Sequence, residues 1–158
     1  MSETTNNRDN PGVIAPPPLI FLAGTVLGLL LHWLLPLRLI PDALQVPVAL
    51  VPLIASVILG LSAAQQFIRA GTHLEPNRPS TAIVTSGPYR FTRNPIYLAM
   101  ALFQTGIGIM VDGVWVLLLL IPVLLVVNYG IIMREERYLE RKFGDEYRRY
   151  KQSVRRWI

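Results

Sequence analysis

Two segments of this chain hold the side chains that could do chemistry. Residues 85–100 have the sequence TSGPYRFTRNPIYLAM, and residues 134–150 have the sequence REERYLERKFGDEYRRY. Carboxylates, guanidinium groups and phenols of this kind can bind a polar small molecule or move protons. Anchoring at a membrane surface and ordinary ion pairing explain the same residues equally well. The candidate groups are Tyr89, Arg90, Arg93, Asn94, Tyr97, Glu135 and Glu136.

The residue types that the chain lacks narrow this chemistry. There is no cysteine, which excludes a disulfide framework, a thiolate metal site and a cysteine nucleophile. The two histidines, His32 and His73, are far apart and lack the spacing of a metal-binding pair. We therefore expect no metal site.

The elements that must position these side chains are four uncharged, apolar runs. They occupy residues 18–37, 43–68, 95–111 and 114–133. A membrane-spanning helix needs about 17 to 25 such residues, and the whole chain is 52% hydrophobic and only 16% charged. The sequence therefore predicts an all-α polytopic membrane bundle with four transmembrane helices.

A turn between the third and fourth runs brings the two polar segments together. Asp112 and Gly113 form a pair that favours turns, so the runs should fold into a tight helical hairpin. Adjacent Glu135 and Glu136 point about 100° apart on a helix, so we expect one to face inward and the other to meet an arginine or solvent. In this antiparallel hairpin, residues at the same height along the axis should be neighbours. The helical rise places Tyr97 level with Asn128, Arg93 level with Ile132, and the region of Arg90 level with Glu135.

The two ends of the chain differ from the apolar runs. Residues 1–17 are polar and proline-rich, which predicts a disordered leader before a single membrane domain at residues 18–158. In residues 134–158 the apolar positions recur every three or four residues, which predicts an amphipathic helix with a break near Gly144. This helix can lie in the membrane interface or pack beneath the bundle. Its apolar positions are Leu139, Phe143, Tyr147, Tyr150, Val154 and Trp157.

The basic residues predict an orientation, since short loops rich in Lys and Arg remain in the cytoplasm. Arg69, Arg78, Arg90 and Arg93 lie between the second and third runs and nine more basic residues follow Met133, whereas the opposite side has only Arg38. Both termini should therefore be cytoplasmic, and the formal charge of +5 should favour anionic membrane lipids. No aromatic and basic module accompanies this charge, so we expect no nucleic acid partner.

The polar segments resemble a known family. Residues 93–99, RNPIYLA, resemble the RHPxYxG element of the isoprenylcysteine carboxyl methyltransferase and phospholipid methyltransferase superfamily, and Glu135-Glu136 resembles its downstream glutamate pair. Asn94 replaces the His of that element and Ala99 replaces its Gly. Asn cannot titrate near neutrality, so a general base at this position would be lost. Supporting matches are Gly71-Thr72 with Pro76, VTSGPY at residues 84–89, FGDEYRRY at residues 143–150 and VRRW at residues 154–157.

The resemblance implies methyl transfer from S-adenosylmethionine inside a helical membrane bundle. It also implies roles for the matching residues. Arg93 or Arg134 would hold the cofactor carboxylate or an anionic substrate, and Glu136 or solvent would receive a proton from an amine or thiol acceptor. The cofactor would be bound by Ile83, Val84, Tyr89, Asn94, Pro95, Tyr97 and Glu135.

The function expected on this basis is methylation of a lipid-like or membrane-partitioning small molecule at the cytoplasmic interface. The acceptor can be a carboxylate, an amine or a thiol. The expected partners are membrane lipids and this hydrophobic substrate, and the oligomeric state is open. The alternative is a non-catalytic four-helix membrane scaffold or a small exporter. The absence of an acidic residue within the apolar runs argues against proton-driven export.

Overall fold

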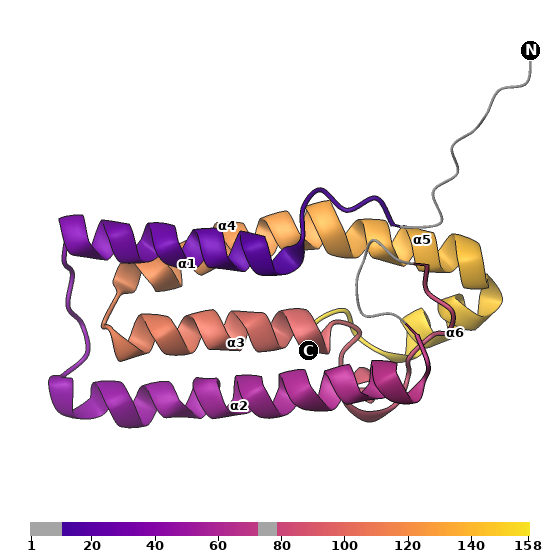
Figure 1. Cartoon of the computed structure of the whole chain (residues 1–158), viewed down its shortest axis with the longest axis horizontal. Coiled ribbons are helices and arrows are strands. Elements are labelled where there is room, and N and C mark those ends of the chain that lie inside the picture. The colour runs from indigo at the N-terminus through magenta and orange to yellow at the C-terminus, as the bar shows by residue number, and fades with distance from the viewer. Residues whose placement is uncertain (1–10, 73–78) are drawn as a thin grey trace, which may run out of the picture.

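The computed structural model describes residues 11–72 and 79–158. The beginning of the predicted leader lies outside these residues, as do His73, Pro76 and Arg78. The described part is helical, as predicted, and its β-type pairing consists of an isolated bridge between Thr92 and Arg155 (Figure 1). The elements are α1 (Pro17–Leu34), α2 (Asp42–Arg69), the 3₁₀ turn η1 (Gly87–Arg90), α3 (Pro95–Met110), α4 (Val114–Val127), the π-helical turn η2 (Asn128–Ile132), α5 (Met133–Phe143) and α6 (Asp145–Ser153).

All four predicted apolar runs form helices, and three of these stretches are long enough to span a membrane. These three are α1, α2 and the continuous helical stretch Val114–Phe143. The fourth, α3, is apolar but has 16 residues, which correspond to about 24 Å of helix. A hydrocarbon core is roughly 30 Å thick, so α3 is short for a span.

α3 is the central helix of the bundle. It packs against α2 on one side and against α4 and α1 on the other (Figure 1). The bundle is close-packed because small residues stand at helix contacts: a Cβ atom added to Gly28 would lie 2.6 Å from the Cα atom of Val116. Phe21 of α1, Tyr97 of α3 and Val127 of α4 belong to one buried apolar cluster.

The turn end of the bundle, formed by residues 35–41 and 111–113, confirms the predicted hairpin. Asp112 has a φ of 50°, a left-handed conformation that Asp adopts more readily than most residues. Its carboxylate accepts hydrogen bonds of 2.9 to 3.1 Å from the backbone N–H groups of Leu39 and Ile40. The α3–α4 turn is thereby tied to the α1–α2 connection.

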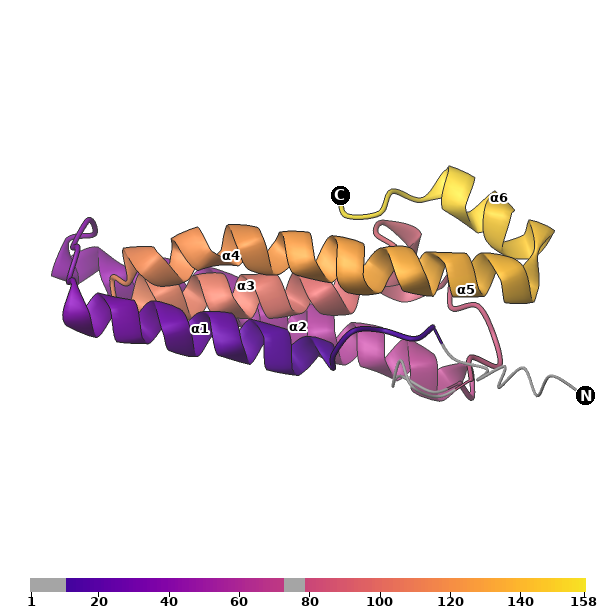
Figure 2. The ribbon, with the colours of Figure 1, turned by 90° about the horizontal axis from the view of Figure 1, so that it is seen from above.

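The opposite end of the bundle is built from α5 and α6. The turn η2 joins α4 to α5 without a break, so the three elements form one rod that extends beyond the other helices (Figure 2). The chain reverses at Gly144, whose φ of 56° favours glycine, and the predicted break is confirmed there. α6 then folds back along α5, and residues 154–158 return to the start of α3 (Figure 2).

The described part of the predicted leader lies against the bundle. α1 begins at Pro17, and residues 11–16 run alongside the rod formed by α4, η2 and α5. Val13 packs on the apolar cluster, the Ile14 side chain contacts Gly130, and the Gly12 carbonyl accepts a hydrogen bond from Arg134. This arrangement was not evident from the polar, proline-rich composition of the segment.

Candidate active site

A cavity of about 390 Å³ lies at the end of the bundle away from the turns, which we call the cavity end. Its walls come from the start of α1, the end of α2, the segment leading into α3, the first turns of α3, and α5 and α6. The two polar segments therefore converge, as predicted. Eight of the ten predicted site residues line the cavity, namely Ile83, Val84, Tyr89, Arg93, Asn94, Tyr97, Glu135 and Glu136.

Glu135 is held by a tyrosine from the other arm of the hairpin. The hydroxyl of Tyr97 donates a hydrogen bond of 2.7 Å to Glu135 Oε1. The hydrogen bond thus reaches beyond Asn128, the residue predicted to lie level with Tyr97, to the second polar segment. Side chains of helices lean toward the helix N-terminus, so these two side chains of antiparallel helices lean toward one another. The wider turn η2 also shifts the residues that follow it.

Glu136 is the carboxylate at which two arginines meet. Arg93 Nη2 lies 3.1 Å from Glu136 Oε1, and the two side chains are only 8% and 7% exposed. Arg156 binds the same carboxylate through both oxygens, with Nε donating at 3.0 Å and Nη2 at 2.7 Å. Arg93 Nε and Nη1 are buried and have no hydrogen-bond partner among the described residues. Two guanidinium groups thus share one carboxylate, and Arg93 has two unused donors.

An aromatic wall closes another side of the cavity. The rings of Tyr89 and Phe67 meet edge to face, with centroids 5.6 Å apart and an interplanar angle of 69°. Ala63 and Val84 complete this apolar cluster. The hydroxyl of Tyr150 donates to the Tyr89 carbonyl oxygen at 2.8 Å, which holds α6 against η1.

The hydroxyls of Tyr89 and Tyr147, two tyrosines that line the cavity, remain protonated. Burial raises the pKa of Tyr89 well above its usual range, and burial together with the nearby charge of Glu136 does the same to the pKa of Tyr147. Both hydroxyls therefore remain hydrogen-bond donors over the whole working range of pH.

Two of the predicted site residues do not line the cavity. Pro95 is fully buried at the first turn of α3, where its fixed φ suits the start of a helix. Arg134 Nη1 donates to the Gly12 carbonyl oxygen at 2.8 Å and so tethers residues 11–16. Asn94 does reach the cavity, but its amide nitrogen donates to the Arg156 carbonyl oxygen at 2.9 Å.

A comparison with known proteins shows to which family the chain belongs. Residues 44–146, which contain both polar segments up to the FGDE stretch, match the family described as phospholipid methyltransferase. The chain belongs to the phospholipid methyltransferase family. An uncharacterized protein of Haemophilus influenzae is 71% identical over 35 residues, which make up 22% of this chain and 56% of that protein. The matching segment therefore covers little more than half of that relative. No solved structure matches the chain.

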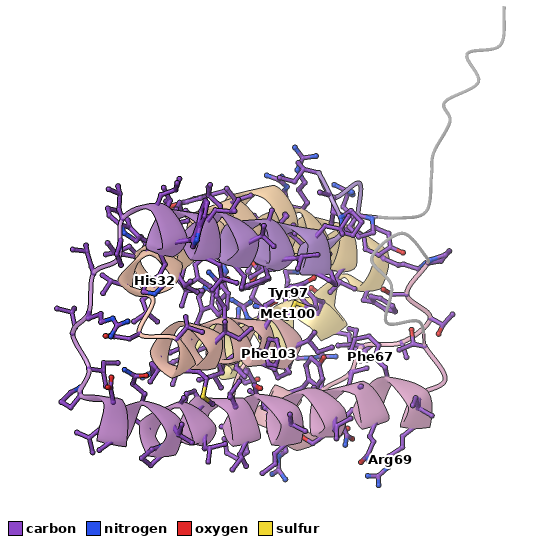
Figure 3. The ribbon with its side chains drawn as sticks, turned by 60° about the vertical axis from the view of Figure 1, so that its left-hand side comes forward. His32, Phe67, Arg69, Tyr97, Met100 and Phe103 are labelled. Atoms are coloured by element: carbon purple, nitrogen blue, oxygen red, sulfur yellow. The ribbon has the colours of Figure 1, made fainter. Side chains whose placement is uncertain are left out.

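Family membership and the three long apolar helices agree that this phospholipid methyltransferase family member is an integral membrane protein. The cavity also contains residues that the sequence did not identify. Phe67 and Met100 line it from α2 and α3 (Figure 3), and Arg156 reaches Glu136 from residues 154–158. The VRRW motif was a signal for Arg156, but the motif does not say which arginine turns inward.

Proposed function

We propose that this protein is an S-adenosylmethionine-dependent methyltransferase of the isoprenylcysteine carboxyl methyltransferase type. Its acceptor is a lipid-like or membrane-partitioning small molecule with a carboxylate, amine or thiol nucleophile. One observation carries the proposal: the cavity holds a carboxylate, Glu135, to which no described basic side chain is paired, beside an arginine with two unused buried donors.

The residues present fit the cofactor. S-adenosylmethionine combines an apolar base and ribose hydroxyls with an ammonium group and a carboxylate, so its site needs flat apolar walls and groups of both charges. The aromatic wall, Glu135 and Arg93 supply these three features within one cavity. A volume of about 390 Å³ lies within the range of small-molecule sites, roughly 300 to 1,000 Å³.

Each cavity residue receives a role from its contacts. Glu135 accepts hydrogen bonds from the hydroxyls or the ammonium group of the cofactor, since its carboxyl oxygens have lone pairs free beyond the one that Tyr97 occupies. Arg93 donates to an anionic group through Nε or Nη1. Ile83 and Val84 supply apolar contact.

Bound in this cavity, S-adenosylmethionine supplies a methyl group that is already activated by the sulfonium. The protein must then align the acceptor and exclude water. Apolar side chains such as Ile96, Met100 and Ile132 face the same cavity and keep its interior dry. No general base is required for a carboxylate acceptor.

Glu136 and Arg134 receive structural roles in this proposal. Glu136 orients Arg93 and does not accept a proton from the acceptor, because guanidinium groups already occupy both of its oxygens. A proton released by an amine or thiol acceptor therefore passes to solvent. Arg134 holds residues 11–16 against the bundle and does not bind the substrate.

Binding of the cofactor is the first test. Isothermal titration calorimetry of the nanodisc-reconstituted protein should show saturable binding of S-adenosylmethionine, and the cofactor should raise the melting temperature. Incubation with S-adenosylmethionine labelled on the methyl group should then move label into the organic extract of bacterial membranes. If millimolar cofactor gave neither heat nor thermal protection, the proposal would be wrong and a non-catalytic scaffold would replace it.

The proposed orientation places the cavity end at the cytoplasmic face and gives the bundle four crossings, α3 included. Basic residues of the described chain support it, since Arg69, Arg90 and α5–α6 lie at this end. Reporter fusions after Ile158 should report cytoplasm, whereas a reporter inserted after Leu37 should report the opposite side. Equal signals from both positions would contradict this topology.

A further inference from the structure

Residues 154–158 are fastened to the segment that carries Arg93. The backbone N–H of Arg93 donates to the Arg155 carbonyl oxygen at 2.9 Å, within the bridge between Thr92 and Arg155. The Arg156 carbonyl oxygen accepts from Thr92 Oγ1 at 3.2 Å and from Asn94 Nδ2 at 2.9 Å. The residues on both sides of Arg93 are therefore clamped to the backbone of residues 155 and 156.

These backbone hydrogen bonds determine where the side chain of Arg156 lies. With its backbone fixed beside Thr92 and Asn94, its guanidinium reaches Glu136 and occupies both carboxylate oxygens. A carboxylate bound in this bidentate manner has used the two lone pairs that point the same way, and its remaining lone pairs diverge, so a second guanidinium cannot bind both oxygens as well. Arg93 accordingly makes one contact with Glu136, through Nη2, while its Nε and Nη1 have no partner in the described chain.

We infer that Arg156 is a positioning residue of the proposed site: by occupying Glu136 it leaves Nε and Nη1 of Arg93 unpaired, so that one of these donors can bind a carboxylate of a bound ligand. The inference rests on the proposed function. Without Arg156, Glu136 would be free to turn onto Arg93 and to pair with a second nitrogen of its guanidinium besides Nη2. The charges agree with this assignment, because one carboxylate between the buried Arg93 and the partly exposed Arg156 leaves a positive charge for an anionic ligand group to neutralise.

Two ligands could supply the carboxylate that binds Arg93: the cofactor, through its amino-acid part, and an acidic methyl acceptor. The cofactor is favoured because its ammonium and carboxylate belong to one zwitterion, and the cavity presents Glu135 and Arg93 together. The acceptor remains the second source. An experiment on Arg156 separates them.

The experiment compares ligands that differ only in the carboxylate. Calorimetry in nanodiscs would measure the affinities of S-adenosylmethionine and its decarboxylated analogue for the wild-type protein and for Arg156→Gln. We expect the wild-type protein to prefer S-adenosylmethionine and Arg156→Gln to lose this preference by about tenfold, with little change for the analogue. A second arm keeps S-adenosylhomocysteine saturating and compares the binding of palmitate with that of hexadecanol. A selective loss of palmitate binding assigns the donors to the acceptor.

Controls separate positioning from general instability. Arg149→Gln removes an exposed arginine of α6 and should leave both affinity ratios unchanged. A purely structural role of Arg156 would weaken both members of each ligand pair equally, and that result would overturn the inference, as would unchanged ratios in both arms. If the wild-type protein bound neither S-adenosylmethionine nor its analogue, the proposed function itself would fail.

Discussion

Both ends of the bundle bury acidic side chains, but they satisfy them differently. At the turn end, Asp112 is 3% exposed and is held by backbone N–H groups of a single loop. At the cavity end, Glu135 and Glu136 are held by side chains from two other parts of the chain, residues 93–97 and residues 154–158. The donors at the turn end are fully used, whereas Arg93 at the cavity end has donors left over.

This difference separates a structural acid from acids of a binding site. Backbone donors fix the loop at residues 35–41, and their pairing with Asp112 leaves nothing for a ligand. Side-chain donors can be shared and rearranged, and unused buried donors cost stability unless a ligand pairs with them. We therefore expect substitutions at the turn end to affect stability alone. Substitutions at the cavity end should affect ligand binding, except where a buried charge loses its partner.

The largest effect should come from that exception, Glu136→Gln. The substitution leaves the buried guanidinium group of Arg93 without its carboxylate, which should lower the free energy of unfolding by about 3 to 5 kcal/mol, and it also removes the partner of the partly exposed Arg156. Thermal unfolding in nanodiscs measures this. Glu140→Gln is the control, because the Glu140–Lys151 pair is partly exposed and contributes about 0 to 1 kcal/mol. Equal melting temperatures of the two variants would contradict the central role of Glu136.

A smaller loss of stability is expected at the turn end. Asp112→Ala removes the acceptor of the Leu39 and Ile40 N–H groups, which should lower the free energy of unfolding by about 2 to 3 kcal/mol. The folded variant should still bind S-adenosylmethionine with unchanged affinity, since the cavity is at the other end. Calorimetry well below the melting temperature checks this, and weakened binding would show that the two ends are coupled.

The helices were predictable because their signal is local. The position and length of each uncharged, apolar run predict where a helix lies, and the Asp112–Gly113 pair predicts where the hairpin turns. The break at Gly144 was predictable for the same reason, since a glycine followed by an acid ends one helix and starts another. The convergence of the two polar segments followed from these local features.

The contacts within the site were less predictable because they depend on distant packing. The hydrogen bond from Tyr97 to Glu135 depends on how the two side chains lean toward one another and on the π-helical turn η2, which the sequence did not predict. Arg156 is 20 positions from Glu136, and its contact depends on how α6 folds back. Similarly, the bond from Asp112 to Leu39 joins two connections that are 73 positions apart.

Substitution of Glu135 should weaken cofactor binding without lowering the stability of the protein. Glu135→Gln retains an oxygen for the Tyr97 hydroxyl but loses the negative charge, so the affinity for S-adenosylmethionine should fall about tenfold to a hundredfold. The melting temperature in the absence of ligand should change little. Glu146→Gln removes an exposed carboxylate of α6 and is the matched control. If the two variants bound the cofactor equally well, Glu135 would not be a ligand of the cofactor.

The smallest effect should come from Tyr97→Phe, which removes one hydroxyl and preserves the ring in the apolar cluster. The hydroxyl orients Glu135 through a 2.7 Å hydrogen bond but leaves its charge in place. A loss of about 0.5 to 1.5 kcal/mol, roughly twofold to tenfold in cofactor affinity, is therefore expected. Because Tyr97 acts through Glu135, the two effects should not add: in a Glu135→Gln background, Tyr97→Phe should change the affinity little further. Calorimetry of the two single variants and the double variant measures this coupling. Fully additive losses would mean that Tyr97 contacts the cofactor independently, and a larger loss for Tyr97→Phe than for Glu135→Gln would move the main polar contact from the carboxylate to the phenol.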